Sequence, residues 1–169
     1  KNKSKTIMRK LKFLLPLMLL AFSSCTSSDD SETTPTTLEV KTTLDLSELA
    51  KLTGNDATAL IKFYGTPADQ YTTDAIIGDK VTYVIETNDA TTIVRFTDYK
   101  YTSGSDNLWS FLEKVNEGGW LVGLEVKQGA EIDQVTKFDI SFQLEVNGVL
   151  QTQKTYLVDP KIRIRAKRS

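Results

Sequence analysis

A strict alternation of apolar and polar residues over Phe138–Val146 is the feature that most constrains the fold of this chain. One polar residue separates each apolar side chain from the next, which is the period of a strand with a single buried face. Strands of this kind have to pair into sheets, because each one buries only one side. Further segments with the same period lie over residues 38–46, 81–85, 92–96 and 161–165.

The dipeptide Asn147-Gly148 directly follows this alternation and predicts a hairpin turn. A two-residue turn would place the polar Gln151 opposite Leu144, whereas a three-residue turn with a bulge would place Leu150 there. Matching of apolar residues sets strand register and favours the bulged form. The last segment, 161–165, alternates isoleucines with cations. We expect it to be an edge or rim strand, because cations on an edge discourage pairing with other chains.

Capping residues and helical spacing predict two short helices. Asp45 begins a capping-box pattern that favours a helix over Ser47 to Thr53, with Gly54 as its stop. Leu60–Tyr64 is equally compatible with a helix and a strand, because periodicity does not decide so short a run. The second helix is predicted after Asp106. Its apolar residues recur at helical spacing and are Leu108, Phe111, Leu112 and Val115.

About seven strands with turn signals between them favour one mainly β domain over residues 38–169. We expect an antiparallel β-sandwich with one or two short helices, and an α+β arrangement is the alternative. The segment Gly78–Asn88 is similar to the start of the immunoglobulin-like repeats of bacterial surface proteins. This resemblance implies a sandwich of immunoglobulin-like type.

Residues 1–24 have the parts of an export signal. Six cations lie in residues 1–12 without any acidic residue, an apolar run follows over Leu11–Phe22, and Ser23-Ser24 supplies small residues at its end. The apolar run is shorter than the roughly 20 residues that span a bilayer, and Pro16 interrupts it. We therefore predict a cleaved signal peptide whose translation starts at Met8 or further upstream.

The sequence Phe22-Ser23-Ser24-Cys25 resembles the lipobox of bacterial lipoproteins. The resemblance implies cleavage before Cys25 and attachment of a diacylglycerol to its thiol, which would anchor the chain in a membrane. The alternative is an ordinary secretory signal in which Cys25, the only cysteine, has no such role. A lone cysteine in an exported protein favours the lipoprotein.

Residues 25–37 are predicted to be an acylated cysteine followed by a flexible tether, because they contain no large apolar side chain. Within them, Ser28–Glu32 resembles the acidic signal that sends Bacteroidota lipoproteins to the outer face of the outer membrane. The resemblance implies a lipid-anchored protein exposed at the cell surface. A plain polar linker and a location on the periplasmic face are the alternative.

The charge of the chain changes when the leader is removed. Six of the 21 Lys and Arg lie in residues 1–24, whereas all 22 Asp and Glu follow, so the mature chain has a formal charge of −7. This balance disfavours nucleic acid as a partner, because nucleic acids attract positive charge. The C-terminal segment is a local exception, with Lys161, Arg163, Arg165, Lys167 and Arg168.

The residue types disfavour an enzyme. The chain has no histidine, the most common general base and metal ligand, and acylation would use its only thiol. Carboxylates are plentiful, but no spacing marks a catalytic pair or a calcium loop. We therefore predict no catalytic residue, no metal and no cofactor.

Four aromatic residues, Tyr99, Tyr101, Trp109 and Trp120, are the candidate ligand-binding residues. Exposed rings stack on sugars or anchor protein partners, whereas buried rings complete a core. Continued alternation along the strand would put the two tyrosines on the face opposite to Phe96.

We predict a lipid-anchored, non-enzymatic binding or structural module at the outer-membrane surface. Its expected partner, besides the membrane, is another envelope protein or a glycan. A carbohydrate-binding lipoprotein that uses the four aromatic residues is the alternative.

Overall fold

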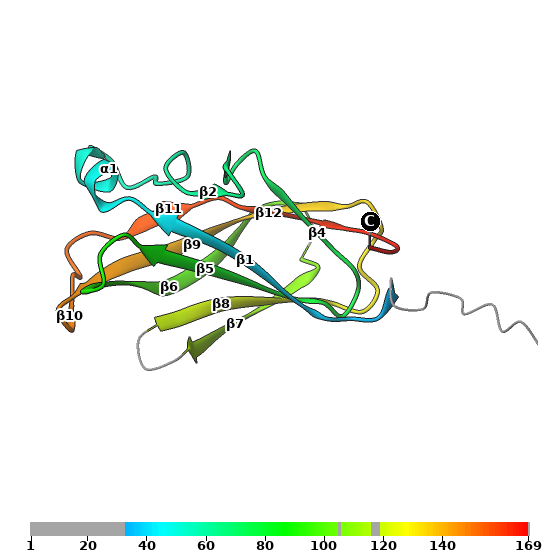
Figure 1. Ribbon diagram of the computed structural model, residues 1–169. Helices are drawn as coiled ribbons and strands as arrows, with labels where there is room; N and C mark the ends of the chain where they lie inside the picture. Colours follow the sequence, from blue (N-terminus) through cyan, green and yellow to red (C-terminus); the bar gives the residue numbers. More distant parts are fainter. Residues whose placement is uncertain (1–32, 105, 116–118, 169) are drawn as a thin grey trace, which may run out of the picture.

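The computed structural model describes residues 33–104, 106–115 and 119–168, which form a mainly β fold with one short helix (Figure 1). Ten of its strands belong to one sheet, and two form a separate hairpin. The strands are β1 (Thr37–Leu44), β2 (Lys62–Phe63), β3 (Thr66–Pro67), β4 (Thr72–Ala75), β5 (Lys80–Thr87), β6 (Thr92–Ser103), β7 (Leu108–Val115), β8 (Gly119–Val126), β9 (Val135–Val146), β10 (Val149–Leu150), β11 (Tyr156–Val158) and β12 (Lys161–Ile164). The helix is α1 (Leu46–Lys51).

The prediction of a mainly β fold is confirmed, but the pairing is mixed and not purely antiparallel. The sheet follows the order β1-β5-β8-β6-β9-β12-β4, with β7 paired to β8 and with β10 and β11 paired to β9. Three of these pairings are parallel, namely β1 with β5, β6 with β8, and β12 with β4. The predicted alternation sets the buried face of the strands. In β9, for example, Phe138, Ile140 and Phe142 are fully buried.

The sheet curls back on itself and encloses the core. β5 and β9 are three steps apart in the sheet order, which in a flat sheet is about 14 Å. The rings of Tyr83 on β5 and Phe138 on β9 nevertheless lie 5.9 Å apart, centre to centre. The Tyr83 hydroxyl also shares a hydrogen bond of 3.1 Å with Thr73 Oγ1 on β4, the last strand of the order. The second and the last strands of the order therefore face each other across the core.

The first predicted helix is confirmed as α1, with Asp45 as its N-cap residue. The Asp45 carboxylate accepts hydrogen bonds from the backbone N–H and the hydroxyl of Ser47, at 2.8 and 2.7 Å. The second predicted helix is wrong, because residues 108–115 form β7. This strand pairs with β8 along its whole length, from Leu108↔Val126 to Val115↔Gly119. Eight residues are too few for a stable isolated helix, so pairing with β8 decides the outcome.

The register after Asn147-Gly148 also differs from the prediction. Val149 pairs with Val146 and Leu150 with Glu145, so the turn has two residues. Asn147 and Gly148 have φ angles of 49° and 78°, as a tight primed turn requires. The next described pair after Leu150–Glu145 is Tyr156–Phe142. Between these two pairs the returning chain advances by six residues and β9 by only three. The intervening loop therefore restores the apolar matching that the tight turn abolishes.

The prediction that the last strand lies at an edge is wrong. β12 pairs with β9 on one side and with β4 on the other. Its cation Arg163 lies opposite Asp74 of β4, and both carboxylate oxygens accept hydrogen bonds from the guanidinium, at 2.7 and 2.9 Å. Because Asp74 balances its charge, Arg163 does not prevent β12 from pairing with β4. The ambiguous segment 60–64 contains β2, which pairs with β3.

Candidate functional site

The first two aromatic candidates lie on β6 beyond a β-bulge. The bulge after Phe96 shifts the register of β6 against β9, so that Tyr99 lies opposite Ile140 and Tyr101 opposite Phe138. Both partners are fully buried, and the Tyr99 ring lies 5.2 Å from that of Phe138. The prediction that the tyrosines face away from the Phe96 side is therefore wrong, because the additional residue of the bulge returns them to the core side.

Tyr99 and Tyr101 are brought together, but they do not form a flat platform. Their ring centres lie 5.4 Å apart, and their planes meet at 69°. The Tyr101 hydroxyl donates to Leu108 O at 3.0 Å and accepts from Leu108 N at 2.8 Å. The Tyr99 hydroxyl is buried without a hydrogen-bond partner, and burial raises the pKa of Tyr99 well above its usual range. These two side chains complete the edge of the core.

Trp109 is the aromatic candidate whose side chain is exposed among those that the structure describes. It lies on β7, is 55% exposed, and has Lys127 Nζ at 5.9 Å from its ring centre. The backbone of Trp120 lies on β8 opposite Arg95, and the side chain of Trp120 lies outside the described residues. The described part of the chain therefore brings only the two tyrosines into contact.

A pocket of about 390 Å³ is lined by four carboxylates, of Asp56, Asp69, Asp139 and Asp159. Burial, followed by repulsion from the other three carboxylates, raises the pKa of Asp159, while Lys137 opposes this shift. The Lys137 Nζ lies 3.9 Å from Asp159 Oδ2. Within the described residues no group of three His, Cys, Asp or Glu side chains is arranged to hold a metal ion.

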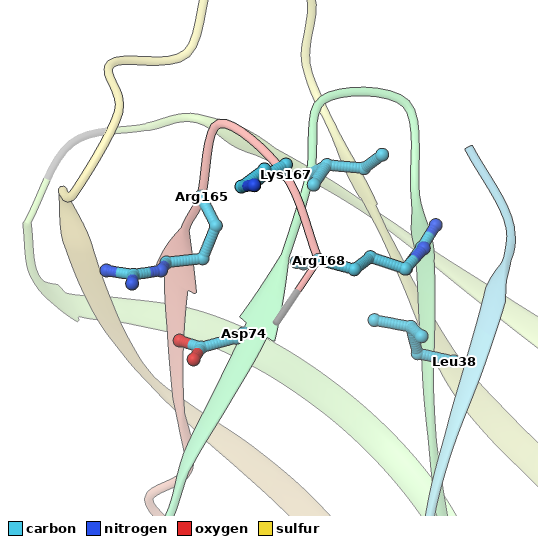
Figure 2. A pocket seen from close by; sticks show the side chains of 7 residues that line it. Leu38, Asp74, Arg165, Lys167 and Arg168 are labelled. Carbon is cyan, nitrogen blue, oxygen red and sulfur yellow. The ribbon is translucent and has the colours of Figure 1, made fainter. Parts of the chain in front are cut away.

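A second pocket, of about 200 Å³, lies where β1 begins and the chain ends, and we name it the basic pocket (Figure 2). Its lining includes three cations of the C-terminal segment, Arg165, Lys167 and Arg168, together with Asp74 of β4 and Leu38 of β1. Figure 2 shows Arg165 and Arg168 extending in opposite directions from this segment, with Lys167 between them along the chain. Cationic side chains thus surround a small, partly apolar hollow.

Arg168 closes one side of the basic pocket by binding the fully buried Asp79. Its Nη1 and Nη2 donate to the two carboxylate oxygens at 2.9 and 2.6 Å. The same carboxylate accepts from Thr36 N at 2.8 Å and from Ile76 N at 2.9 Å. Arg168 Nη2 also donates to Thr34 O at 2.8 Å. The start of β1, the turn before β5 and the C-terminal segment are therefore tied together at one point.

Arg165 lies on the other side of the basic pocket. Its Nη1 donates to Asp133 Oδ1 at 2.7 Å, which is its one side-chain contact among those described. A guanidinium has five N–H donors, so most of those of Arg165 remain for a ligand. Lys167 is exposed to solvent.

Sequence reasoning missed Asp79 as a site residue. Gly78-Asp79 has the composition of an ordinary turn, and the partner of Asp79 lies 89 positions away, so no local spacing indicates the pair. The run of cations over residues 161–168 was the only feature of the sequence that indicated this pocket.

Cys25, the predicted lipidation residue, lies outside the described residues, as do the leader and most of the tether. Among the residues described, no helix has the length and apolar character needed to cross a membrane.

The fold and the basic pocket define a small, mainly β domain whose two ends are fixed to each other by a buried ion pair. No protein-family model matches the chain, and no curated protein matches it. The chain is similar in structure to the inclusion body protein PixA from Burkholderia cenocepacia J2315, with a TM-score of 0.57. The likeness covers 78% of this chain and 96% of that chain at 9% sequence identity, so it concerns the fold alone.

Proposed function

We propose that this chain is a lipid-anchored lipoprotein of the bacterial cell envelope, which acts as a non-enzymatic binding or structural module at the outer-membrane surface. The export leader, the lone Cys25 and the acidic segment Ser28–Glu32 support this proposal. A diacylglyceryl group on Cys25 would hold the domain at the membrane, because two acyl chains bind firmly where one binds marginally.

The observation that carries the proposal is the position at which the tether would join the domain. Thr34 and Thr36 are held at the basic pocket, where the C-terminal segment also lies (Figure 1). A domain attached at this end presents its opposite end, with α1 and β10, away from the membrane. Val149 and Leu150 of β10 are 62% and 42% exposed there, which leaves apolar surface for a partner.

We also propose that the curled sheet is a β-sandwich of immunoglobulin-like type. The contact of Tyr83 with Phe138 supports two facing layers, and the hydrogen bond of Tyr83 with Thr73 supports the meeting of their edges. The likeness in fold to PixA, which covers most of both chains, is compatible with a single domain of this size.

Cell fractionation of a host that exports lipoproteins tests the proposed anchor. We expect the native chain in the outer-membrane fraction and Cys25→Ser to be absent from that fraction, because the variant has no thiol to acylate. Thr26→Ala is the matched control and is expected to stay with the membrane. Cys25→Ser in the outer-membrane fraction at the level of the native chain would contradict the proposal.

Protease treatment of intact cells tests the proposed face of the membrane. The native chain should be degraded. The triple variant Asp29→Asn/Asp30→Asn/Glu32→Gln removes the acidic side chains of the tether. We expect this variant to resist the protease in intact cells and to stay in the membrane fraction. A native chain that resists the protease until the cells are broken places the domain on the periplasmic side.

Carbohydrate binding is the second candidate function, and the exposure of Trp109 favours it. Half-exposed tryptophan rings stack on sugar rings. A glycan array with the domain should then show binding that Trp109→Ala abolishes. Tyr64→Ala, which removes a ring that is 70% exposed elsewhere, should leave that binding unchanged.

A further inference from the structure

The basic pocket lies beside the point where the tether enters the domain. Arg168 Nη2 donates to Thr34 O at 2.8 Å, and Thr34 follows Cys25 by nine residues. A fully extended chain of that length spans at most about 30 Å. If Cys25 is acylated, the basic pocket cannot lie further than this from the membrane surface.

The charges around the basic pocket leave donors for an anionic ligand. Asp79 binds Arg168 and Asp133 binds Arg165. The carboxylate of Asp74 itself lines the pocket and is balanced by Arg163 of the neighbouring strand β12. These bonds engage a single N–H of Arg165 among the described contacts. Lys167 lines the pocket and has an interaction partner of its own, so it contributes positive charge there. A ligand that enters the pocket therefore meets N–H donors and positive charge in an otherwise acidic mature chain.

The size of the basic pocket and the shape of its donors favour a phosphate group. A volume of about 200 Å³ admits one small anionic group and not a folded partner. The planar fork of a guanidinium matches two oxygens of a phosphate, and an ammonium group adds a point charge. Leu38 and Ile76 give part of the lining an apolar character, which suits a headgroup attached to an acyl chain.

We propose that the basic pocket binds a phosphate group, of the kind carried by the headgroups of anionic lipids in the membrane to which the chain is anchored. This inference rests on the proposed function for the source of the phosphate. Only nine positions separate Cys25 from Thr34, so the contact is intramolecular, and even a weak site would be occupied at the high effective concentration that a short linker gives. The contact would orient the domain on the membrane in addition to the anchor.

Vesicle binding by the mature chain without its acyl group tests the pocket independently of the anchor. The probe is residues 25–169 with Cys25→Ser, added to vesicles of phosphatidylglycerol and phosphatidylcholine or of phosphatidylcholine alone. We expect binding to the anionic vesicles only, and binding that weakens with added salt. Calorimetric titration with inorganic phosphate is the second arm, and it detects a pocket that takes free phosphate.

The variant Arg165→Gln/Lys167→Gln removes two cations of the pocket that are not part of the buried ion pair. Binding should weaken about tenfold or more, as expected when two basic residues near an anionic surface are lost. Lys51→Gln/Lys62→Gln is the matched control, because it makes the same change of charge at two exposed residues on α1 and β2. The control should bind within about twofold of the unmodified chain. Thermal unfolding of both variants shows whether they remain folded.

Each result decides the proposal. Loss of vesicle binding in the pocket variant alone supports a lipid phosphate as the ligand. Binding of inorganic phosphate that the pocket variant loses, without vesicle binding, supports the pocket and assigns it to a soluble phosphate. Equal effects of the two variants, or no binding in either arm, would overturn the proposal. None of these results depends on acylation of Cys25, so failure of the anchor would be seen separately, by fractionation.

Discussion

Arg168 and Asp79 lie 89 positions apart and form a doubly hydrogen-bonded ion pair at the start of the domain. The carboxylate is fully buried, and the guanidinium side chain is 25% exposed. Asp79 also accepts hydrogen bonds from the backbone of Thr36 and Ile76, so four N–H groups satisfy it. This arrangement makes the C-terminal segment part of the domain and fixes the point at which the tether would arrive.

Removing Arg168 should destabilise the domain strongly. Arg168→Met leaves the buried Asp79 carboxylate without its counter-charge, and loss of one partner of a buried ion pair costs about 3–5 kcal/mol. The double variant Asp79→Asn/Arg168→Met should lose clearly less than the sum of the two single changes, because it leaves no unpaired charge. Urea unfolding of the four proteins measures this coupling. Lys62→Met, at an exposed residue of β2, is the control and should change the unfolding free energy by less than about 0.5 kcal/mol. Additive losses would show that the pair is not coupled.

Removing either tyrosine hydroxyl of the β6 pair should have opposite effects. Tyr99→Phe deletes a buried hydroxyl that has no hydrogen-bond partner, so the unfolding free energy should stay the same or rise by up to about 1 kcal/mol. Tyr101→Phe deletes a hydroxyl that bonds both backbone groups of Leu108, and it should cost about 1–2 kcal/mol. Thermal or urea unfolding tests the difference in sign. A Tyr99→Phe variant as unstable as Tyr101→Phe would contradict the placement of the tyrosines.

Two glycine substitutions separate backbone strain from steric collision. Gly104 and Gly129 have φ angles of 90° and 83°, so a side chain strains the backbone at both. A Cβ on Gly104 would lie 2.5 Å from Val135 O, whereas nothing lies within 4 Å of one on Gly129. Gly129→Ala should cost about 1 kcal/mol and Gly104→Ala clearly more, about 2–3 kcal/mol. Equal losses in the unfolding free energy would contradict the close contact of Gly104 with the start of β9.

The carboxylate of Asp159 should make stability depend on pH. Burial and the neighbouring carboxylates raise its pKa above the usual value of 3.8, so the folded protein holds this proton more tightly than the unfolded chain. Its contribution to stability is fully present below 3.8 and is lost as the pH rises through the raised pKa. Asp159→Asn should therefore raise the urea midpoint at neutral pH, and the gain should shrink at acidic pH. Glu131→Gln, an exposed change of the same kind, should show no such dependence.

Local patterns in the sequence predicted the strands that alternate cleanly and the cap of α1. Pairing partners decided the features that were predicted wrongly. Residues 108–115 have helical spacing of apolar residues, yet β8 offers a partner along their whole length. The cations of 161–165 indicated an edge, yet Asp74 on β4 balances Arg163 within the sheet. Neither partner is visible from the segment itself.

The candidate site was less predictable than the fold. A bulge of one residue in β6 reverses the side to which Tyr99 and Tyr101 point, and the residues around Thr97 carry no glycine or proline that would announce it. The basic pocket depends on Asp79, whose only unusual property is its complete burial. Burial arises from the tertiary fold and cannot be read from a turn dipeptide.

The mass of the N-terminal peptide of the mature protein, isolated from the envelope of a lipoprotein-exporting host, tests the central claim most directly. The proposal predicts a peptide that begins at Cys25 and carries the added mass of a diacylglyceryl group. An unmodified Cys25 thiol, or a peptide that retains residues of the leader, would contradict the lipid anchor.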